Sequence, residues 1–268
     1  MMKKKWTKQE DSLLTRYYLR KRTRDVVQLF KNRSHHAVRS RAYHLKLSNK
    51  KSIDNRKYDI NDIFFNIPNV INSYWAGFLA ADGCINYHSN RIEVDLQHND
   101  KPHLQKLQKA LDYTGHIHSR IINNKLYTRL SFSSKIIKKD LLKNFNITSQ
   151  KSLILHPPYL KNENHIRAFI RGYFDGDGCL TFDKASQHYV IGFCGTKKFL
   201  TWIKINLKYY ITNVGNPSIC SLKNTQCKSL RFGGRKQTKL IIKWLYTNSI
   251  DQTRLDRKFK LAMKAKEY

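Results

Sequence analysis

The chain has 268 residues, enough for two domains, and its 51 lysines and arginines against 19 acidic residues give a formal net charge of +32. Hydrophobic residues make up 40% of the sequence, which is enough for an ordinary core and excludes a disordered basic tail. A charge of this size predicts a polyanionic partner, that is, nucleic acid.

Membrane proteins and secreted disulfide-rich proteins are also excluded. No run of residues approaches the roughly 20 apolar positions of a membrane span, and no apolar stretch follows the basic start MMKKKWT, so we expect no signal peptide. The five cysteines are odd in number and form no Cys-x-x-Cys pair. We therefore expect neither disulfides nor a zinc site, and an intracellular location in the cytoplasm or nucleoid of a bacterium or phage-infected cell, or in an organelle.

Residues 1–48 are predicted to form a separate unit of three short helices. Thr7 and Glu10 have the spacing of a capping box, in which each side chain bonds the backbone amide of the other residue at the start of a helix. A second helix fits residues 23–30, and Ser34 can cap a third.

The third helix has an apolar side and a basic side. The basic side carries the residues that we expect to contact DNA, namely Arg39, Arg41 and His44. Together with Trp6 and Arg33, this arrangement resembles a Myb/SANT-like helix-turn-helix, whose third helix would lie in a major groove. A small helical bundle that binds another protein is the alternative.

A charged, irregular connector is predicted over residues 49–69, and a main domain follows over residues 70–268. The main domain is predicted to repeat one order of elements in two halves, at about 70–155 and 160–268.

The residues 91–97 alternate between apolar and polar side chains, which is typical of a strand with one buried face. The first half is predicted as a helix at 70–81, strands at 84–88 and 91–97, a helix at 101–111, strands at 116–122 and 126–132, and a helix at 135–144. The second half is predicted as a helix at 163–176, strands at 179–183 and 189–194, a helix at 197–209, strands at 218–223 and 228–232, and helices at 236–246 and 254–266.

Each half opens with a helix that ends in Asp-Gly, and the two helices have related sequences. Residues 74–83 are YWAGFLAADG and residues 169–178 are FIRGYFDGDG, so Asp82 and Asp177 occupy the same place in the two copies. Small residues such as Gly77 would let the two helices approach closely and bring both carboxylates near one axis of pseudo-twofold symmetry.

Two carboxylates held close together repel each other unless a cation lies between them. Hard oxygen ligands with room for water suit Mg²⁺. A divalent metal held in this way can activate water and stabilise the leaving oxygen of a phosphodiester. The alternative is that each aspartate merely ends its helix.

The two motifs and the order of elements resemble the LAGLIDADG homing endonucleases, enzymes of mobile elements, over nearly the whole main domain. The resemblance implies an α+β fold, a duplicated α-β-β-α-β-β-α unit with pseudo-twofold symmetry, in which Asp82 and Asp177 are the catalytic metal ligands. Ala80 replaces an acid that is usual in the family and that Asp175 keeps, but this position is not the catalytic one. The resemblance also implies basic or amide residues around the reactive water, and the candidates are Lys151, Lys258 and Gln97.

In this family each half contributes an antiparallel sheet that straddles the DNA major groove, so outward side chains of the sheets are candidates for DNA contact. They are Asn86, His88, Arg91, His116, His118, Arg120, Tyr127, Arg129, Lys228 and Arg231. In the last strand, parity decides whether Lys228 or the pair Ser229 and Arg231 faces DNA. Glu93 and Asp95 alternate with the same apolar neighbours and, facing DNA, would have to accept hydrogen bonds from cytosine.

The sequence thus predicts a monomeric, Mg²⁺-dependent homing endonuclease that makes a double-strand break in a long target. Its partner would be double-stranded DNA, without an obligatory protein partner or a membrane. Two alternatives use the same scaffold: a non-cleaving DNA-binding transcription regulator and an intron RNA maturase.

Overall fold

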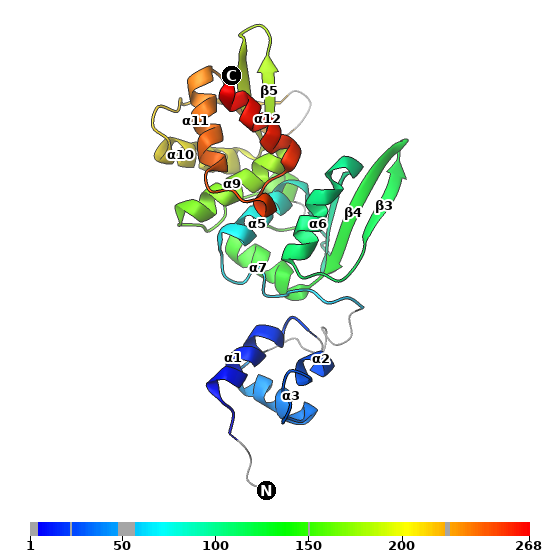
Figure 1. The fold of residues 1–268 in the computed structure, drawn as a ribbon. Coiled ribbons are helices and arrows are strands. Elements are labelled where there is room, and N and C mark those ends of the chain that lie inside the picture. The colour runs from blue at the N-terminus through cyan, green and yellow to red at the C-terminus, as the bar shows by residue number, and fades with distance from the viewer. Residues whose placement is uncertain (1–4, 22, 48–56, 150, 223–225) are drawn as a thin grey trace. The chain divides into compact units, whose positions relative to one another are not determined.

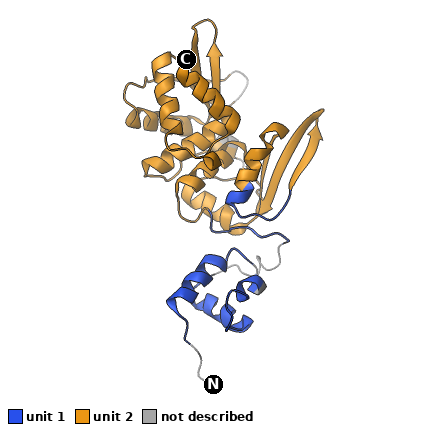
Figure 2. Ribbon diagram, viewed as in Figure 1, with its two compact units in different colours: residues 1–64, 108–116 blue, residues 65–107, 117–268 orange. Residues whose placement is uncertain are grey.

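The computed structural model describes residues 5–21, 23–47, 57–149, 151–222 and 226–268 (Figure 1). Residues 49–56 of the predicted connector therefore lie outside the described residues. The chain divides into two compact units, residues 1–64 with 108–116 and residues 65–107 with 117–268 (Figure 2). Among the described residues, no helix is long and apolar enough to cross a bilayer.

The first part of the chain forms three helices, α1 (Lys8–Tyr17), α2 (Thr23–Val27) and α3 (His35–His44). The predicted capping box is present, because Thr7 and Glu10 bond each other's backbone amides. The Ser34 side chain caps α3 by accepting from the Ala37 amide. The residues that form the buried centre of this helical part are Leu14, Tyr18, Val26, Phe30, Val38 and Ala42.

Helix α2 is shorter than predicted. Beyond Val27 the chain leaves the α-helical pattern, since the amides of Leu29 and Phe30 bond carbonyls three residues back, and the Leu29 side chain is exposed. Further on, the Asn61 amide bonds the Leu111 carbonyl and the Thr114 amide bonds the Asp59 carbonyl. The end of the predicted connector is therefore hydrogen-bonded to the segment after α6.

The main domain has the predicted duplicated architecture. The first half comprises α5 (Val70–Asp82), β1 (Gly83–Ile85), β2 (Arg91–Gln97), α6 (Lys101–Ala110), β3 (Ile117–Ile122), β4 (Lys125–Ser133) and α7 (Lys135–Phe145). The second comprises α9 (Glu163–Asp177), β5 (Cys179–Asp183), β6 (His188–Gly195), α10 (Lys197–Tyr210), β7 (Ile219–Ser221), β8 (Lys228–Phe232), α11 (Arg235–Tyr246) and α12 (Asp256–Glu267). The strand orders β1-β2-β4-β3 and β5-β6-β8-β7 are equivalent, and every pairing is antiparallel. The α+β class and the duplication are confirmed.

Two features of the observed fold differ from the prediction at residues of the candidate site. Strand β1 ends at Ile85, so Asn86 and His88 lie in the loop to β2, where the Asn86 side chain accepts from the Ser89 amide. A short helix α8 (Lys151–Ile154) opens the predicted linker between the halves. Lys223, the predicted end of a strand, lies outside the described residues.

Helices α5 and α9 are in backbone contact at the centre of the main domain (Figure 1). A Cβ atom added at Gly77 would lie 2.0 Å from the Phe169 carbonyl oxygen, and one added at Gly172 would lie 2.0 Å from the Tyr74 carbonyl oxygen. The two contacts are reciprocal, as pseudo-twofold symmetry requires. The predicted role of the small residues is therefore confirmed.

We expect Gly172→Ala to destabilise the fold, because the new methyl group would meet backbone that a rotamer change cannot move. Overpacking of this kind lowers the free energy of unfolding by about 3 kcal/mol. Denaturant titration measures this loss, with Gly215→Ala as control, since a Cβ there meets the end of the flexible Gln237 side chain at 3.1 Å. A wild-type unfolding midpoint for Gly172→Ala would contradict this account of the helix contact.

Candidate active site and nucleic-acid interface

The backbone contact brings the two motif aspartates to neighbouring helix ends. Asp82 is the last residue of α5 and Asp177 the last residue of α9. A Cβ atom added at Gly176 would lie 3.1 Å from Asp82 Oδ2, so the Asp82 carboxylate lies against the end of the other motif helix. Asp82 is half-buried and Asp177 is exposed. The structure thus brings together the two acids that the sequence singled out.

Both carboxyl groups resist ionisation in the absence of a cation. Burial, and then repulsion by Asp177, raise the pKa of Asp82 from 3.8 to about 6. Although the Asp177 residue as a whole is exposed, the protein atoms around its carboxyl group remove water from it and raise its pKa, against the charges of Lys151 and Lys258. Loss of hydration, more than repulsion, therefore makes the charged form of both acids unfavourable unless a cation binds.

The two predicted lysines lie beside these acids and donate hydrogen bonds to backbone carbonyls at the ends of the motif helices. Lys151 Nζ donates to the Ala81 carbonyl at 2.6 Å, and Lys258 Nζ donates to the carbonyls of Phe174, Gly176 and Gly178 at 2.6–2.8 Å. The last carbonyls of a helix have no partner within the helix, and a cation there also interacts favourably with the helix dipole. Burial lowers the pKa of both lysines, that of Lys258 to about 8.

The donor set fits a hard divalent cation. Within the described residues there is no group of three or more His, Cys, Asp or Glu side chains that could hold a metal, so the protein offers the carboxylates of Asp82 and Asp177. Mg²⁺ is commonly held by one or two carboxylates and keeps several waters, and substrate phosphate oxygens can complete its shell. Two such acids at one place suit that binding mode.

The remaining predicted site residue is Gln97, and a further residue, Arg257, was not predicted. Gln97 is exposed at the end of β2, and since β1 begins at Gly83 opposite Val94, it projects past the start of β1. Arg257 was missed by sequence reasoning. It pairs with Asp100 at 2.8 Å, and its charge lowers the pKa of Asp82. Its position next to Lys258 was the available signal.

On the outward face of the first sheet, the side chains of neighbouring strands lie directly opposite one another. Asp95 lies opposite Arg129, and Arg129 lies opposite His118. The same parity places most of the predicted DNA contacts on this face: Arg91, His118, Arg120, Tyr127 and Arg129. His116 precedes β3 and packs its ring edge-on against Tyr58 at 5.5 Å.

The acidic residues of this face are already paired. Arg129 bonds Asp95 at 2.7 Å and Glu93 at 3.2 Å, and Arg120 bonds Asp95 at 3.0 Å. Glu93 and Asp95 therefore do not stand as free charges that would repel phosphate. They order the arginine side chains across three strands.

In the second sheet the structure settles the strand parity. Leu230 and Phe232 are buried, so Ser229 and Arg231 lie on the opposite face, with Arg231 exposed. Lys228 shares the parity of Leu230, and its Nζ donates to Ser221 Oγ at 2.8 Å. Arg231, and not Lys228, therefore lies on the outward face.

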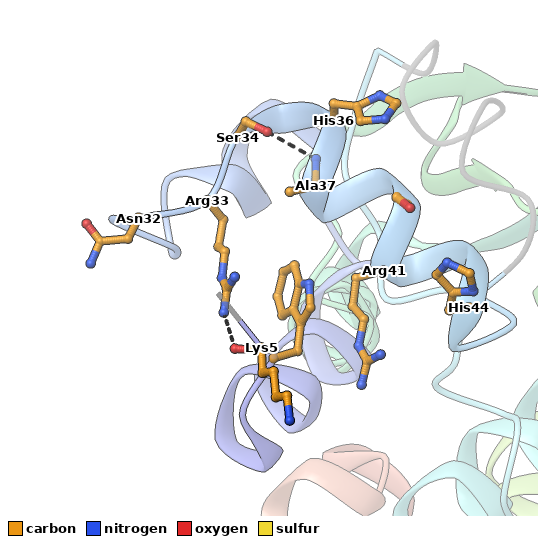
Figure 3. A pocket seen from close by; sticks show the side chains of 10 residues that line it. Lys5, Asn32, Arg33, Ser34, His36, Ala37, Arg41 and His44 are labelled. Carbon is orange, nitrogen blue, oxygen red and sulfur yellow. Dashed lines mark hydrogen bonds between the residues drawn. The ribbon is translucent and has the colours of Figure 1, made fainter. Parts of the chain in front are cut away.

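The helical part of the first unit carries an open hollow of about 970 Å³ beside α3, lined by Lys5, Trp6, Asn32, Arg33, Ser34, His36, Ala37, Ser40, Arg41 and His44 (Figure 3). Two of its arginines bind α1. Arg41 makes a two-bond ion pair with Asp11 at 2.5 and 2.7 Å, and Arg33 pairs with Glu10. Arg39 and His44 are exposed. Of the three predicted DNA contacts on α3, Arg41 is thus engaged within the protein.

Comparison with known proteins identifies the fold. Residues 69–148 match the family model described as a LAGLIDADG-like domain, so that part of the chain is similar to this domain. The I-LtrWI LAGLIDADG homing endonuclease bound to target DNA has a TM-score of 0.50 and 12% identity, over 74% of this chain and 89% of that one. Among curated proteins, none matches the sequence significantly.

Two further solved structures are similar. Full-length DUF199/WhiA from "Thermatoga maritima" has a TM-score of 0.47 and 16% identity, over 76% of this chain and 64% of that chain. The meganuclease I-SmaMI bound to uncleaveable DNA has a TM-score of 0.48 and 13% identity, over 73% and 90%. The chain thus spans less than two thirds of the length of WhiA. Identities this low show the fold alone. The likeness to I-LtrWI and the family-model match over residues 69–148 confirm the predicted LAGLIDADG fold.

We expect Asp82→Asn to stabilise the metal-free protein at neutral pH. The folded pKa of Asp82 lies above its unfolded value, so the stability given by the protonated carboxyl is complete below about pH 4 and is lost as the pH rises through about 6. At pH 7.5 in chelator the variant should gain about 1–2 kcal/mol, a value reduced for solvent screening, and the gain should vanish near pH 4.

Thermal unfolding with and without Mg²⁺ measures this effect. Metal that binds only the folded state should raise the midpoint of the wild type and not that of Asp82→Asn. Asp112→Asn is the control, because Asp112 is exposed and its positive φ of 46° suits asparagine. Equal responses of all three proteins to Mg²⁺ would show that Asp82 holds no metal.

Proposed function

We propose that the protein is a site-specific DNA endonuclease that makes a double-strand break by metal-dependent hydrolysis of phosphodiester bonds. One observation carries the proposal: both motif helices end in an aspartate, and at each helix end a buried lysine donates hydrogen bonds to the backbone carbonyls. A LAGLIDADG-like protein that only binds DNA has no need for two carboxylates whose pKa values are raised by burial. Because both halves belong to one chain, we propose a monomer that acts on double-stranded DNA inside the cell.

The mechanism follows from what the residues can do. The outward faces of the two sheets would lie in the major groove, with the arginines of the first sheet held by Glu93 and Asp95. Asp82 and Asp177 would hold Mg²⁺, which when bound supplies the charge that activates water and stabilises the leaving oxygen. Lys151 and Lys258 would hold the two helix ends in place, and their charges would favour the extra negative charge of the transition state.

A non-cleaving regulator of transcription is the second candidate, because the same fold can bind DNA without hydrolysing it. Incubation with a library of duplex targets in Mg²⁺ separates the two candidates. Cleavage supports the endonuclease and also yields the target sequence, whereas retention of uncut duplexes under the same conditions supports the regulator. Selective retention of intron RNA would instead support a maturase.

Asp82→Asn or Asp177→Asn should abolish cleavage while DNA binding persists, because the lost group holds metal and contacts no base. Metal assistance is worth several kcal/mol, so we expect a loss of about 10³-fold or more in the cleavage rate. Labelled duplex assays give this rate, and binding is measured in chelator. Asp112→Asn serves again as the control, and an undiminished rate in either motif variant would remove that aspartate from the mechanism.

The helical part of the first unit should add a second DNA contact outside the core target. Tethering a second binding module raises its effective concentration without changing the catalytic site. Deleting residues 1–50 should therefore weaken target affinity and shorten the DNA footprint on one side, while the cut positions stay the same.

Two point variants sharpen this test. Arg39→Ala should weaken DNA binding with little effect on stability, because Arg39 is exposed. Arg41→Ala should instead lower the stability of the helical part, because it removes the ion pair with Asp11. An unchanged footprint after the deletion would show that the first 50 residues have another role.

A further inference from the structure

Asp175 is fully buried in the centre of the main domain and its carboxylate accepts three hydrogen bonds. Tyr74 Oη and the Leu255 amide donate to Oδ2, each at 2.8 Å, and Tyr246 Oη donates to Oδ1 at 2.9 Å. A buried carboxyl group is strongly unfavourable unless it is bonded in this way. Asp175 therefore joins α9 to α5, to α11 and to the start of α12.

A second side chain of α9 fixes the same segment. Arg171, one helical turn before Asp175, is also buried, and its guanidinium donates to the carbonyls of Thr253 and Leu245 at 2.8 Å. Residues 253–255 are thus held from two points of α9. These residues lead directly into α12.

Helix α12 carries Lys258 close to its first turn. The bond from Leu255 to Asp175 fixes the start of that helix, and Lys258 then reaches the three carbonyls at the end of α9. Asp175 therefore anchors the start of the helix that carries Lys258.

The described residues of the first half show no equivalent arrangement. Ala80 stands in the place of Asp175, and its methyl group cannot accept a hydrogen bond. Phe169 stands in the place of Tyr74 and has no hydroxyl group. Lys151 lies on the four-residue helix α8 and bonds the Ala81 carbonyl. The two lysines thus occupy similar places, but only the helix of Lys258 is anchored by a buried carboxylate among the described residues.

Each lysine also shares its surroundings with the acid of the other half. Lys151 and Asp177 line one small cavity of about 210 Å³. Asp82 lies against Gly176, whose carbonyl accepts from Lys258 at 2.8 Å. The molecule therefore contains two composite sites, one with Asp177 and Lys151 and the other with Asp82 and Lys258.

We propose that Asp175 is a positioning residue for Lys258, so that the site of Asp82 and Lys258 is the better organised one and cuts its DNA strand first. This inference rests on the proposed endonuclease function. It predicts that a nicked duplex accumulates before the double-strand break, always with the same strand cut.

The test compares Asp175→Ala with Asp175→Asn on a duplex that carries a different label on each strand. Asparagine keeps an oxygen for the Leu255 amide, whereas alanine removes it. We expect Asp175→Ala to slow the preferred strand at least about tenfold, because displacing a catalytic group by an ångström can reduce a rate about 100-fold. The other strand should change less than about twofold, and Asp175→Asn should restore most of the preference.

Two controls separate positioning from general loss of structure. Thr238→Val removes a buried hydroxyl that bonds the Tyr189 carbonyl, in the same half but outside the hydrogen bonds of Asp175 and Lys258, and should leave the strand preference intact. Lys258→Met should slow the strand that Asp175→Ala slows, and Lys151→Met the opposite strand. Equal cutting of both strands by the wild type would overturn the proposal.

A second measurement needs no cleavage. Acetylation by an amine-reactive ester, followed by peptide mass spectrometry, reports the reactivity of each lysine in the metal-free protein. Lys258 should react slowly in the wild type and at least about tenfold faster in Asp175→Ala, while Lys151 stays unchanged. If no duplex is cleaved at all, the proposed function fails and this labelling alone decides whether Asp175 positions Lys258. Equal labelling of Lys258 in wild type and Asp175→Ala would overturn the positioning role.

Discussion

The main domain depends on the backbone contact between α5 and α9. Gly77 lies against the Phe169 carbonyl and Gly172 against the Tyr74 carbonyl, so no side chain separates the two helices at either point. This contact fixes the axis that relates the two halves. It also sets how close the two helix ends lie, and therefore brings Asp82 and Asp177 near each other. A helix pair separated by larger side chains would keep the two sheets but would hold the acids apart.

The electrostatics of the helix ends follow from the same contact. Helix C-termini carry partial negative charge, and each of these ends also carries a carboxylate. The buried ammonium groups of Lys151 and Lys258 satisfy the carbonyls, yet the pKa values of both aspartates stay raised. The two carboxylates thus remain poorly hydrated even with the lysines in place, which is a condition that favours binding of a cation.

Much of this architecture could be predicted from the sequence because it is encoded locally and encoded twice. The repeated Asp-Gly motif gave both acids, and period-two alternation gave β2 with its correct buried face. The predicted strand over residues 84–88 was too long although the signal was local, because the Asn86 side chain accepts from the Ser89 amide and turns the chain. Local patterns are blind, however, to partners that lie far along the chain. They could not show that Arg41 binds Asp11, because residues distant in sequence decide whether a basic side chain is free. The network around Asp175 was missed for the same reason, as its three donors come from three different segments.

The two halves share a backbone plan and differ in chemistry. The outward face of the first sheet holds its arginines with Glu93 and Asp95. The corresponding face of the second sheet carries small side chains such as Cys194 and Ser229 beside Arg231. Separate copies of one polypeptide would have to carry identical faces, whereas two halves joined in one chain can change independently. The same independence explains why the first motif has Ala80 at the position where the second motif has Asp175. A duplicated fold of this kind therefore keeps symmetry where the helices touch and loses it on the surfaces and in the supports of the site, where an asymmetric double helix would be bound.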